Sequence, residues 1–222
     1  MKGFLKRFVG SLKSGAANSS SDDMSWFCPP GDLHDAAAWD RYWMNQIAHG
    51  LRPEIFDMFC DIQTMVAALQ ANGLHRVLYV GCGISLEPLA LSVAGFDVTA
   101  LDLSPAALEI SARAYPDAPR RPTCVVGDLT DASICPGPFD AIVERRTLQL
   151  FPETERPAAM AAVANRMGPR GIFFSHSHDG RWKPPAPRRH FTRSWFEDHQ
   201  WPIWDQTTPV TGRVAWLFLS TG

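Results

Sequence analysis

The sequence predicts an α/β protein in which one mostly parallel sheet carries helices on both faces. Between residues 76 and 175, five short apolar runs alternate with segments of helical character. Such alternation implies right-handed crossovers between parallel strands. Two glycines, Gly81 and Gly83, follow directly after the first apolar run, as expected where a strand ends in a tight turn. The 222 residues are 45% hydrophobic and 20% charged, which suits one well-packed domain.

The N-terminal segment, residues 1–23, is expected to be flexible or amphipathic. Phe4, Phe8 and Leu12 recur at helical spacing among basic residues, and a small, polar stretch follows them. One interpretation is a frayed or locally docked terminal helix. The other is an interfacial helix that makes weak contact with anionic lipid through residues 1–13.

Residues 24–74 are expected to form a helical cap ahead of the sheet. One helix is predicted over 35–50, where Gly50 ends it. A second helix is predicted after Pro53, because its apolar residues fall on one face until Asn72-Gly73 stops it. We therefore expect a single domain over residues 24–222, with this cap as its first part.

Local signals place the elements of the alternation. Gly95 breaks the first helix, Ser104 can cap the second, and Pro105 suits the first position of that helix. Strands are predicted at 76–80, 97–101, 123–126, 139–143 and 171–175, and helices at 86–94, from 104 onward and at about 154–167. In the tail we expect a helix at 191–200 and strands at 202–206 and 213–219. These two strands are predicted to pair as an antiparallel hairpin and to complete a seven-stranded sheet.

Polar positions at the strand ends predict a nucleoside-bearing cofactor. In an open parallel sheet, ligands bind beyond the carboxyl ends of the strands. Asp102 ends the second strand, where a carboxylate can accept both hydroxyls of a ribose, and Asp128 follows the third, where it can meet the amine of adenine. Leu86 occupies the position of the last glycine in a dinucleotide fingerprint, so NAD is only weakly supported.

These pieces, with Glu144 at the end of the fourth strand, resemble the class I S-adenosylmethionine-dependent methyltransferases over residues 75–219. Gly83-Ile84-Ser85 and the segment Glu144-Arg145-Arg146-Thr147-Leu148 resemble, more distantly, the thiopurine methyltransferase group. The resemblance implies a single Rossmann-like methyltransferase domain and S-adenosylmethionine as cofactor. It also implies methyl transfer to the sulfur, nitrogen or oxygen of a small molecule.

The resemblance also implies roles for particular residues. Tyr79 stands where many of these enzymes place an acid near the amino group of the cofactor. The glycine turn would pass beneath methionine and ribose, Asp102 would hold the ribose, and Glu144 would lie near the sulfonium. The implied cofactor-binding residues are Tyr79, Gly81, Cys82, Gly83, Ser85, Asp102, Leu103, Asp128, Leu129 and Glu144.

The substrate side of such folds is built from the N-terminal segment and from the loops after the fourth and fifth strands. Here these supply Trp39, Tyr42, Trp43, Arg145, Arg146 and Trp182. Aromatic walls with a few polar groups suit a small, partly apolar methyl acceptor, although each tryptophan can instead be plain packing.

Two histidines that alternate along an extended segment, His176 and His178, are candidate catalytic bases, because imidazole titrates near neutrality. The alternative is a pair with structural hydrogen bonds. No metal is expected, because no cysteine pair or second ligand cluster accompanies them.

Composition narrows the remaining classes. Five cysteines without a CxxC pair argue against a zinc ribbon or a disulfide framework and fit a reducing cytoplasm. A net charge of −2 argues against general nucleic-acid binding. The alternatives to small-molecule methylation are a cofactor-binding protein that has lost the chemistry and a methyltransferase acting on RNA or protein. The oligomeric state is left open.

Overall fold

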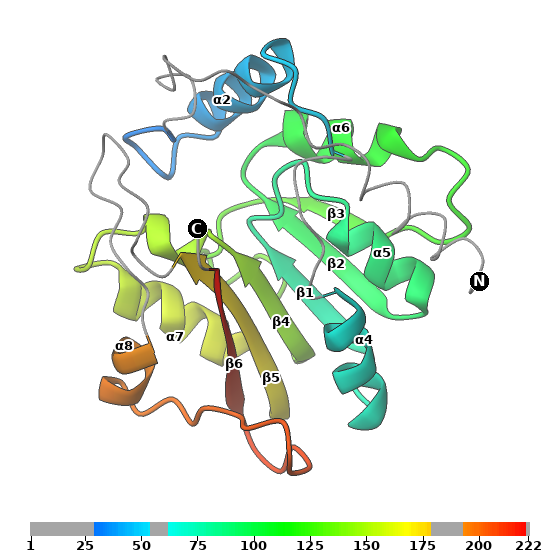
Figure 1. The fold of residues 1–222 in the computed structure, drawn as a ribbon. Helices are drawn as coiled ribbons and strands as arrows, with labels where there is room; N and C mark the ends of the chain where they lie inside the picture. The colour runs from blue at the N-terminus through cyan, green and yellow to red at the C-terminus, as the bar shows by residue number, and fades with distance from the viewer. Residues whose placement is uncertain (1–28, 54–61, 179–192, 221–222) are drawn as a thin grey trace.

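The computed structural model describes residues 29–53, 62–178 and 193–220. In this part of the chain, six strands form one sheet in the order β3-β2-β1-β4-β5-β6, and every neighbouring pair is parallel (Figure 1). The strands are β1 (Arg76–Val80), β2 (Asp97–Asp102), β3 (Thr123–Val126), β4 (Phe139–Arg145), β5 (Met167–His178) and β6 (Val214–Ser220). The strand order reverses between β1 and β4, which is the switch point where such sheets bind ligands.

Helices cover both faces of the sheet, as predicted. The described helices are α2 (Ala36–Ala48), α4 (Ile62–Ala71), α5 (Glu87–Ala94), α6 (Pro105–Ala114), α7 (Arg156–Arg166) and α8 (Arg193–Asp198). Alternate residues of β1 point to opposite faces. Val77 and Tyr79 pack in the core beneath α4 and α5, whereas Leu78 and Val80 pack in the core beneath α7 and α8.

The predicted helix ends are confirmed. The Ser104 hydroxyl accepts a hydrogen bond from the Ala107 amide at 3.0 Å, and Pro105 is the first residue of α6. Gly95 ends α5 in a left-handed conformation, with φ of 111°. The second cap helix is present from Ile62 as α4, and residues 54–61 lie outside the described part.

The predicted tail is wrong in two respects. The described sheet has six strands, not seven, and β6 runs parallel to β5 instead of forming an antiparallel hairpin. Residues 202–206 contribute only a bridge from Ile203 to Ala215, and that bridge is also parallel. Figure 1 shows why: α8 lies near the edge where the strands begin, so the chain enters β6 from that edge.

Helix α2 stands beyond the carboxyl edge of the sheet and packs on α6 (Figure 1). Trp43 of α2 is buried against Ala107 of α6. Asp40 of α2 accepts hydrogen bonds from the Ser104 hydroxyl at 2.5 Å and from the Ala106 amide at 3.1 Å. A carboxylate is favoured at the N-terminus of a helix, so this contact fixes α2 over the strand ends.

Candidate functional site

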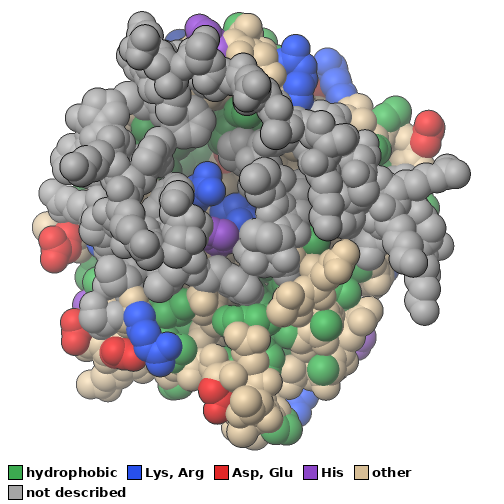
Figure 2. Space-filling model, viewed as in Figure 1, with side chains coloured by type: hydrophobic (Ala, Val, Ile, Leu, Met, Phe, Trp, Pro, Cys, Tyr) green, Lys and Arg blue, Asp and Glu red, His purple; other side chains and the backbone are tan. Residues whose placement is uncertain are grey.

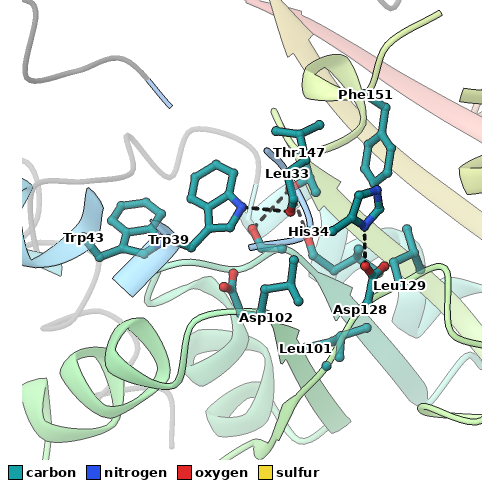
Figure 3. Close-up of a pocket in the computed structure, with 14 residues that line it drawn as sticks. Leu33, His34, Trp39, Trp43, Leu101, Asp102, Asp128, Leu129, Thr147 and Phe151 are labelled. Atoms are coloured by element: carbon teal, nitrogen blue, oxygen red, sulfur yellow. Dashed lines mark hydrogen bonds and ion pairs between the residues drawn. The ribbon is translucent and has the colours of Figure 1, made fainter. Parts of the chain in front are cut away.

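A cleft of about 600 Å³ opens at the carboxyl ends of β1 and β2, beneath α2 (Figure 3). Its floor is formed by Val80 and Gly81, by Leu101 to Leu103, and by the turn at 127–129 after β3. Leu33, His34, Trp39 and Trp43 line it from the N-terminal side, and Thr147 and Phe151 line it from the segment after β4. Most of these side chains are apolar, and two carboxylates, Asp102 and Asp128, stand among them.

Two features require glycine at positions 81 and 83: the backbone conformation and the close approach of neighbouring side chains. Gly81 and Gly83 have φ values of 59° and 52°, which other residues rarely adopt. A Cβ on Gly81 would lie 2.3 Å from the hydroxyl of Thr147, and one on Gly83 would lie 2.4 Å from the Trp43 ring. Both glycines therefore allow side chains from distant segments to pack directly on the turn.

Asp102 is anchored by the two loops that flank the cleft. One carboxylate oxygen accepts the Gly83 amide at 2.6 Å and the other accepts the Ser104 amide at 2.8 Å. The residue is only 8% exposed. Burial raises the pKa of this carboxyl to about 6, although the amide hydrogen bonds oppose the rise. The side chain is held in one orientation at the wall of the cleft.

Asp128 is paired with His34, a residue that was not predicted from the sequence as part of the site. His34 Nδ1 lies 2.5 Å from one oxygen of Asp128, and the Thr130 amide and hydroxyl each donate to the other oxygen at 2.7 Å (Figure 3). Burial raises the pKa of Asp128, but the hydrogen bonds from His34 and Thr130 outweigh it and leave the pKa below its usual value. The hydrogen bond to Asp128 in turn raises the pKa of His34.

His34 also approaches a second carboxylate. Its Nε2 lies 3.5 Å from Glu155, and its ring meets Phe151 edge-on at 6.1 Å between centroids. This one side chain joins the segment before α2 to the turn after β3 and to the segment before α7. No local pattern could have revealed it, because its partners lie 94 and 121 residues away.

A second polar cluster lies at the carboxyl ends of β4 and β5. Glu87, which is 0% exposed, accepts hydrogen bonds from the Tyr79 hydroxyl and from Arg145 Nη2. Arg145 Nη1 lies 2.6 Å from His176 Nδ1. Arg145, His176 and Glu87 line a cavity of about 190 Å³ together with Met65, Val143, Glu144 and Phe174. Basic and histidine side chains gather near the centre of the face shown in Figure 2.

Glu144 connects this cluster to the cleft. Its Oε2 accepts the amides of Thr147 and Leu148 at 3.0 and 3.2 Å, and its Oε1 accepts the hydroxyl of Ser175. Burial raises the pKa of Glu144 to about 7, and the hydrogen bond from Ser175 acts in the opposite direction. The carboxyl therefore shapes the turn that carries Thr147 onto Gly81.

The structure brings only some of the predicted site residues to the cleft. Those that line it are Trp39, Trp43, Gly81, Asp102, Leu103, Asp128 and Leu129, and Gly83 lies directly beneath Trp43. Cys82 and Ser85 line a different cleft, between α5 and α6. Tyr42 packs edge-on between Trp39 and Trp43 without lining the cleft.

The remaining predicted residues lie elsewhere. Tyr79, Glu144, Arg145 and His176 belong to the second cluster, and Arg146, with φ of 61°, follows β4 directly. The side chain of His178 and all of Trp182 lie outside what the structure describes. Seven residues that line the cleft were not predicted from the sequence as site residues: Leu33, His34, Val80, Leu101, Gly127, Thr147 and Phe151.

Among the described residues, no group of three or more His, Cys, Asp or Glu side chains is placed to hold a metal ion. None of the helices within them is long and apolar enough to cross a bilayer. Residues 1–13, for which weak lipid contact was predicted, lie outside the described part.

The central part of the chain is similar to a known protein family. Residues 77–171, from β1 into β5, match a family described as "Methyltransferase domain". TehB from Haemophilus influenzae superposes with a TM-score of 0.55 at 18% identity, over 75% of this chain and 57% of that protein. This likeness shows a shared fold.

Two further structures are similar over a smaller share of the chain. One comes from work on the conversion of a disulfide bond into a thioacetal group during echinomycin biosynthesis, with 25% identity, a TM-score of 0.49, and coverage of 61% of this chain and 57% of that one. The other is magnesium protoporphyrin IX methyltransferase from Synechocystis, with 21% identity, a TM-score of 0.44, and coverage of 65% and 64%. The chain thus spans between 57% and 64% of the length of these three proteins.

Proposed function

We propose that this chain, whose residues 77–171 match a methyltransferase domain family, is a class I S-adenosylmethionine-dependent methyltransferase that transfers a methyl group to a sulfur, nitrogen or oxygen atom of a small molecule. The observation that carries the proposal is the fixed carboxylate of Asp102 on the wall of the cleft. Both of its oxygens are oriented by backbone amides, and each keeps a lone pair for a further donor.

The adenosine half of the cofactor fits the cleft. Asp102 would accept the two ribose hydroxyls, and Asp128 would accept the adenine amine beside His34. Leu103 and Leu129 would contact the faces of the adenine ring. A cleft with mostly apolar walls and a few placed polar groups is typical of sites for small ligands.

The methionine half would lie over the glycine turn. Trp43 and Thr147 pack on Gly83 and Gly81 there, so these two side chains would border the methionine. Glu144 would contribute to the methionine end indirectly, because it holds the turn that places Thr147 there. Tyr79, Cys82 and Ser85 would support the turn from behind, because they lie outside the cleft.

Bound S-adenosylmethionine supplies a methyl group on a sulfonium centre, which a nucleophile can accept in one in-line displacement. The work left to the protein is to position the acceptor and to exclude water, and such orientation can supply much of the rate. Residues 24–74 would contribute to the substrate side as a cap, since Leu33, Trp39 and Trp43 already line the cleft. Arg145, the last residue of β4, and Arg146, which follows it, would bind the acceptor from the opposite side. The roles of Tyr42 and Trp182 in binding the acceptor stay predictions from the sequence.

Thermal stability with added ligands tests this function. At a ligand concentration 100 times Kd, binding to the folded state adds about 2.7 kcal/mol to its stability. We expect S-adenosylmethionine and S-adenosylhomocysteine to raise the melting temperature and NAD to leave it unchanged. If neither methyl-cycle ligand shifts the transition, the proposed function is wrong.

One observation favours a second candidate, a cofactor-binding protein that no longer catalyses transfer. Tyr79 stands where many relatives carry an acid, and its hydroxyl is committed to the buried Glu87. A panel of small thiols, amines and phenols with radiolabelled S-adenosylmethionine separates the two. Stabilisation by the cofactor without labelled product from any acceptor would favour the silent protein.

A further inference from the structure

Tyr79, Glu87, Arg145 and His176 form a buried polar cluster, and its composition suggests a functional role. It joins β1, α5, β4 and β5 by hydrogen bonds, and it places a carboxylate, a guanidinium and an imidazole in nearly complete burial. Buried ionic groups are costly unless each is paired. The adenosine end of the proposed site uses none of these four residues.

The direction of the hydrogen bonds fixes the tautomer of His176. All guanidinium nitrogens of arginine are donors, and arginine has no acceptor atom. The contact of 2.6 Å between Arg145 Nη1 and His176 Nδ1 therefore requires Nδ1 to accept. An imidazole that accepts at Nδ1 carries its proton on Nε2.

Arg145 is in turn held in place. Its other terminal nitrogen, Nη2, donates to Glu87, and the second oxygen of Glu87 receives the Tyr79 hydroxyl. The guanidinium thus spans two fixed partners with two nitrogens, which the single ammonium of lysine cannot reproduce. Tyr79, Glu87 and Arg145 are positioning residues for the imidazole.

We propose that His176 meets the methyl acceptor as a hydrogen-bond donor through its Nε2 proton and not as a base. This inference rests on the proposed function and revises the catalytic role predicted from the sequence. His176 lines a cavity at the carboxyl ends of β4 and β5, on the edge of the sheet that holds the cleft. The acceptor gives no proton to His176, so its nucleophile is either already deprotonated or loses its proton to water.

The same cluster indicates which group the donor takes. The charge of Arg145 is already offset by Glu87, which is fully buried beside it. An anionic group would find no uncompensated positive charge in this cavity. A neutral carbonyl oxygen, in contrast, needs only a hydrogen-bond donor. We therefore assign the cavity to a carbonyl group of the acceptor. The cavity is small, so it suits such a group and not a whole molecule.

Nitrogen NMR of the full chain labelled with ¹⁵N-histidine tests the tautomer directly and needs no cofactor. We expect His176, identified by its loss in His176→Gln, to show a protonated Nε2 and an unprotonated Nδ1. His49 and His199 are internal controls, because their Nδ1 atoms donate to the carbonyls of Asn45 and Trp195 and must carry the proton. An Nδ1-protonated His176 in the wild-type protein would overturn the inference.

The Arg145→Lys variant tests the positioning residues. It keeps the charge but loses the fork, so we expect the Nδ1-protonated form of His176 to become populated while that of His199 stays constant. An unchanged His176 spectrum in folded Arg145→Lys would refute the role given to Arg145. If this variant does not fold, the wild-type tautomer still decides the main claim.

Titration with benzamide and benzoate tests the ligand class. Benzamide presents a neutral carbonyl and is expected to give a saturable shift of the His176 Nε2 proton, larger than the shift with benzoate. No shift with benzamide, or a larger one with benzoate, would overturn the carbonyl assignment. Because S-adenosylmethionine binding is measured separately by thermal stability, failure of this inference is distinct from failure of the proposed function.

Discussion

The carboxylate of Asp102 has two sets of partners, backbone amides in the structure and ribose hydroxyls in the proposed complex. Replacement by alanine removes two charge-assisted hydrogen bonds to ribose, each worth roughly 1.5–3 kcal/mol. We expect Asp102→Ala to weaken S-adenosylhomocysteine binding at least tenfold by calorimetry, since about 1.4 kcal/mol corresponds to a factor of ten. The variant should also lose stability, because the Gly83 and Ser104 amides lose their acceptor.

The matched control lies at the other end of the same strand. Asp97 begins β2 and is exposed, so Asp97→Ala should leave the affinity unchanged. Equal affinities for wild-type protein and folded Asp102→Ala would show that the ribose binds elsewhere.

Because of the raised pKa of Asp102, we expect the affinity for S-adenosylhomocysteine to fall in acidic solution. Burial raises this pKa to about 6, and only the ionised carboxylate can accept both hydroxyls. Affinity for S-adenosylhomocysteine should therefore be constant above pH 7 and fall as the pH drops below about 6. Calorimetry across this range measures it. In Asp102→Asn the inflection near pH 6 should disappear, and its persistence there would assign the titration to another group.

At the scale of elements, replacing a glycine in the turn after β1 would cost stability for two reasons: the left-handed backbone conformation and the clash of the new Cβ with a neighbouring side chain. An alanine in a left-handed conformation costs about 1–2 kcal/mol by itself. Gly73→Ala, at φ of 64° with nothing within 4 Å of the new Cβ, should show this cost alone. Gly83→Ala should cost clearly more in urea denaturation, because its Cβ would lie 2.4 Å from the Trp43 ring. Equal losses in the two variants would mean that α2 yields without cost.

How far the sequence predicts each element depends on how local its signals are. The apolar runs, Gly95 and the pair Ser104-Pro105 act within a few residues, and the elements they predict are confirmed. The direction of β6 is not local, because it depends on where α8 delivers the chain. A turn with proline and glycine between residues 206 and 213 suits a hairpin equally well, and this led to the wrong prediction.

The same distinction holds for the site. Asp102 and Asp128 were predictable because the carboxyl ends of parallel strands share one edge of the sheet. Contacts between distant segments, such as His34 with Asp128 and Trp43 on Gly83, depend on the position of α2 and carry no periodic signal. The tautomer of His176 likewise follows from one contact between β4 and β5.

At the scale of the whole molecule, two buried carboxyls contribute to the pH dependence of stability. The folded pKa values of Asp102 and Glu144, about 6 and about 7, lie above those of unfolded chains. The folded state thus binds more protons, and the free energy of unfolding falls as pH rises from about 4.5 to 7. The pairing of His34, which is 44% exposed, acts in the same direction. The lowered pKa of Asp128 contributes stability that is lost only in more acidic solution, as the pH falls through that pKa.

Urea denaturation at pH 5.5 and 7.5 measures this dependence. We expect the protein to be less stable at pH 7.5, with Glu144 contributing on the order of 2–3 kcal/mol at most. Glu144→Gln should reduce the difference, because glutamine does not ionise. A wild-type stability that rises between these pH values would contradict the assignment of protonated carboxyls to the fold.

The segment before α2 joins the cap to the sheet, and two truncations test its contribution to binding. Deletion of residues 1–22 removes none of the described residues that line the cleft, so we expect S-adenosylhomocysteine affinity to stay unchanged. Deletion of residues 1–34 also removes Leu33 and His34 but keeps Asp35, which caps α2. This second truncation should weaken binding roughly three- to tenfold, because Asp128 loses its partner and the cleft loses one wall.

Calorimetry on both proteins gives the comparison, and sedimentation with anionic vesicles shows whether residues 1–13 contact lipid. A loss of affinity already present in the shorter deletion would assign part of the site to residues 1–22. Equal affinity in all three proteins would show that His34 and Asp128 pair without any effect on the cofactor.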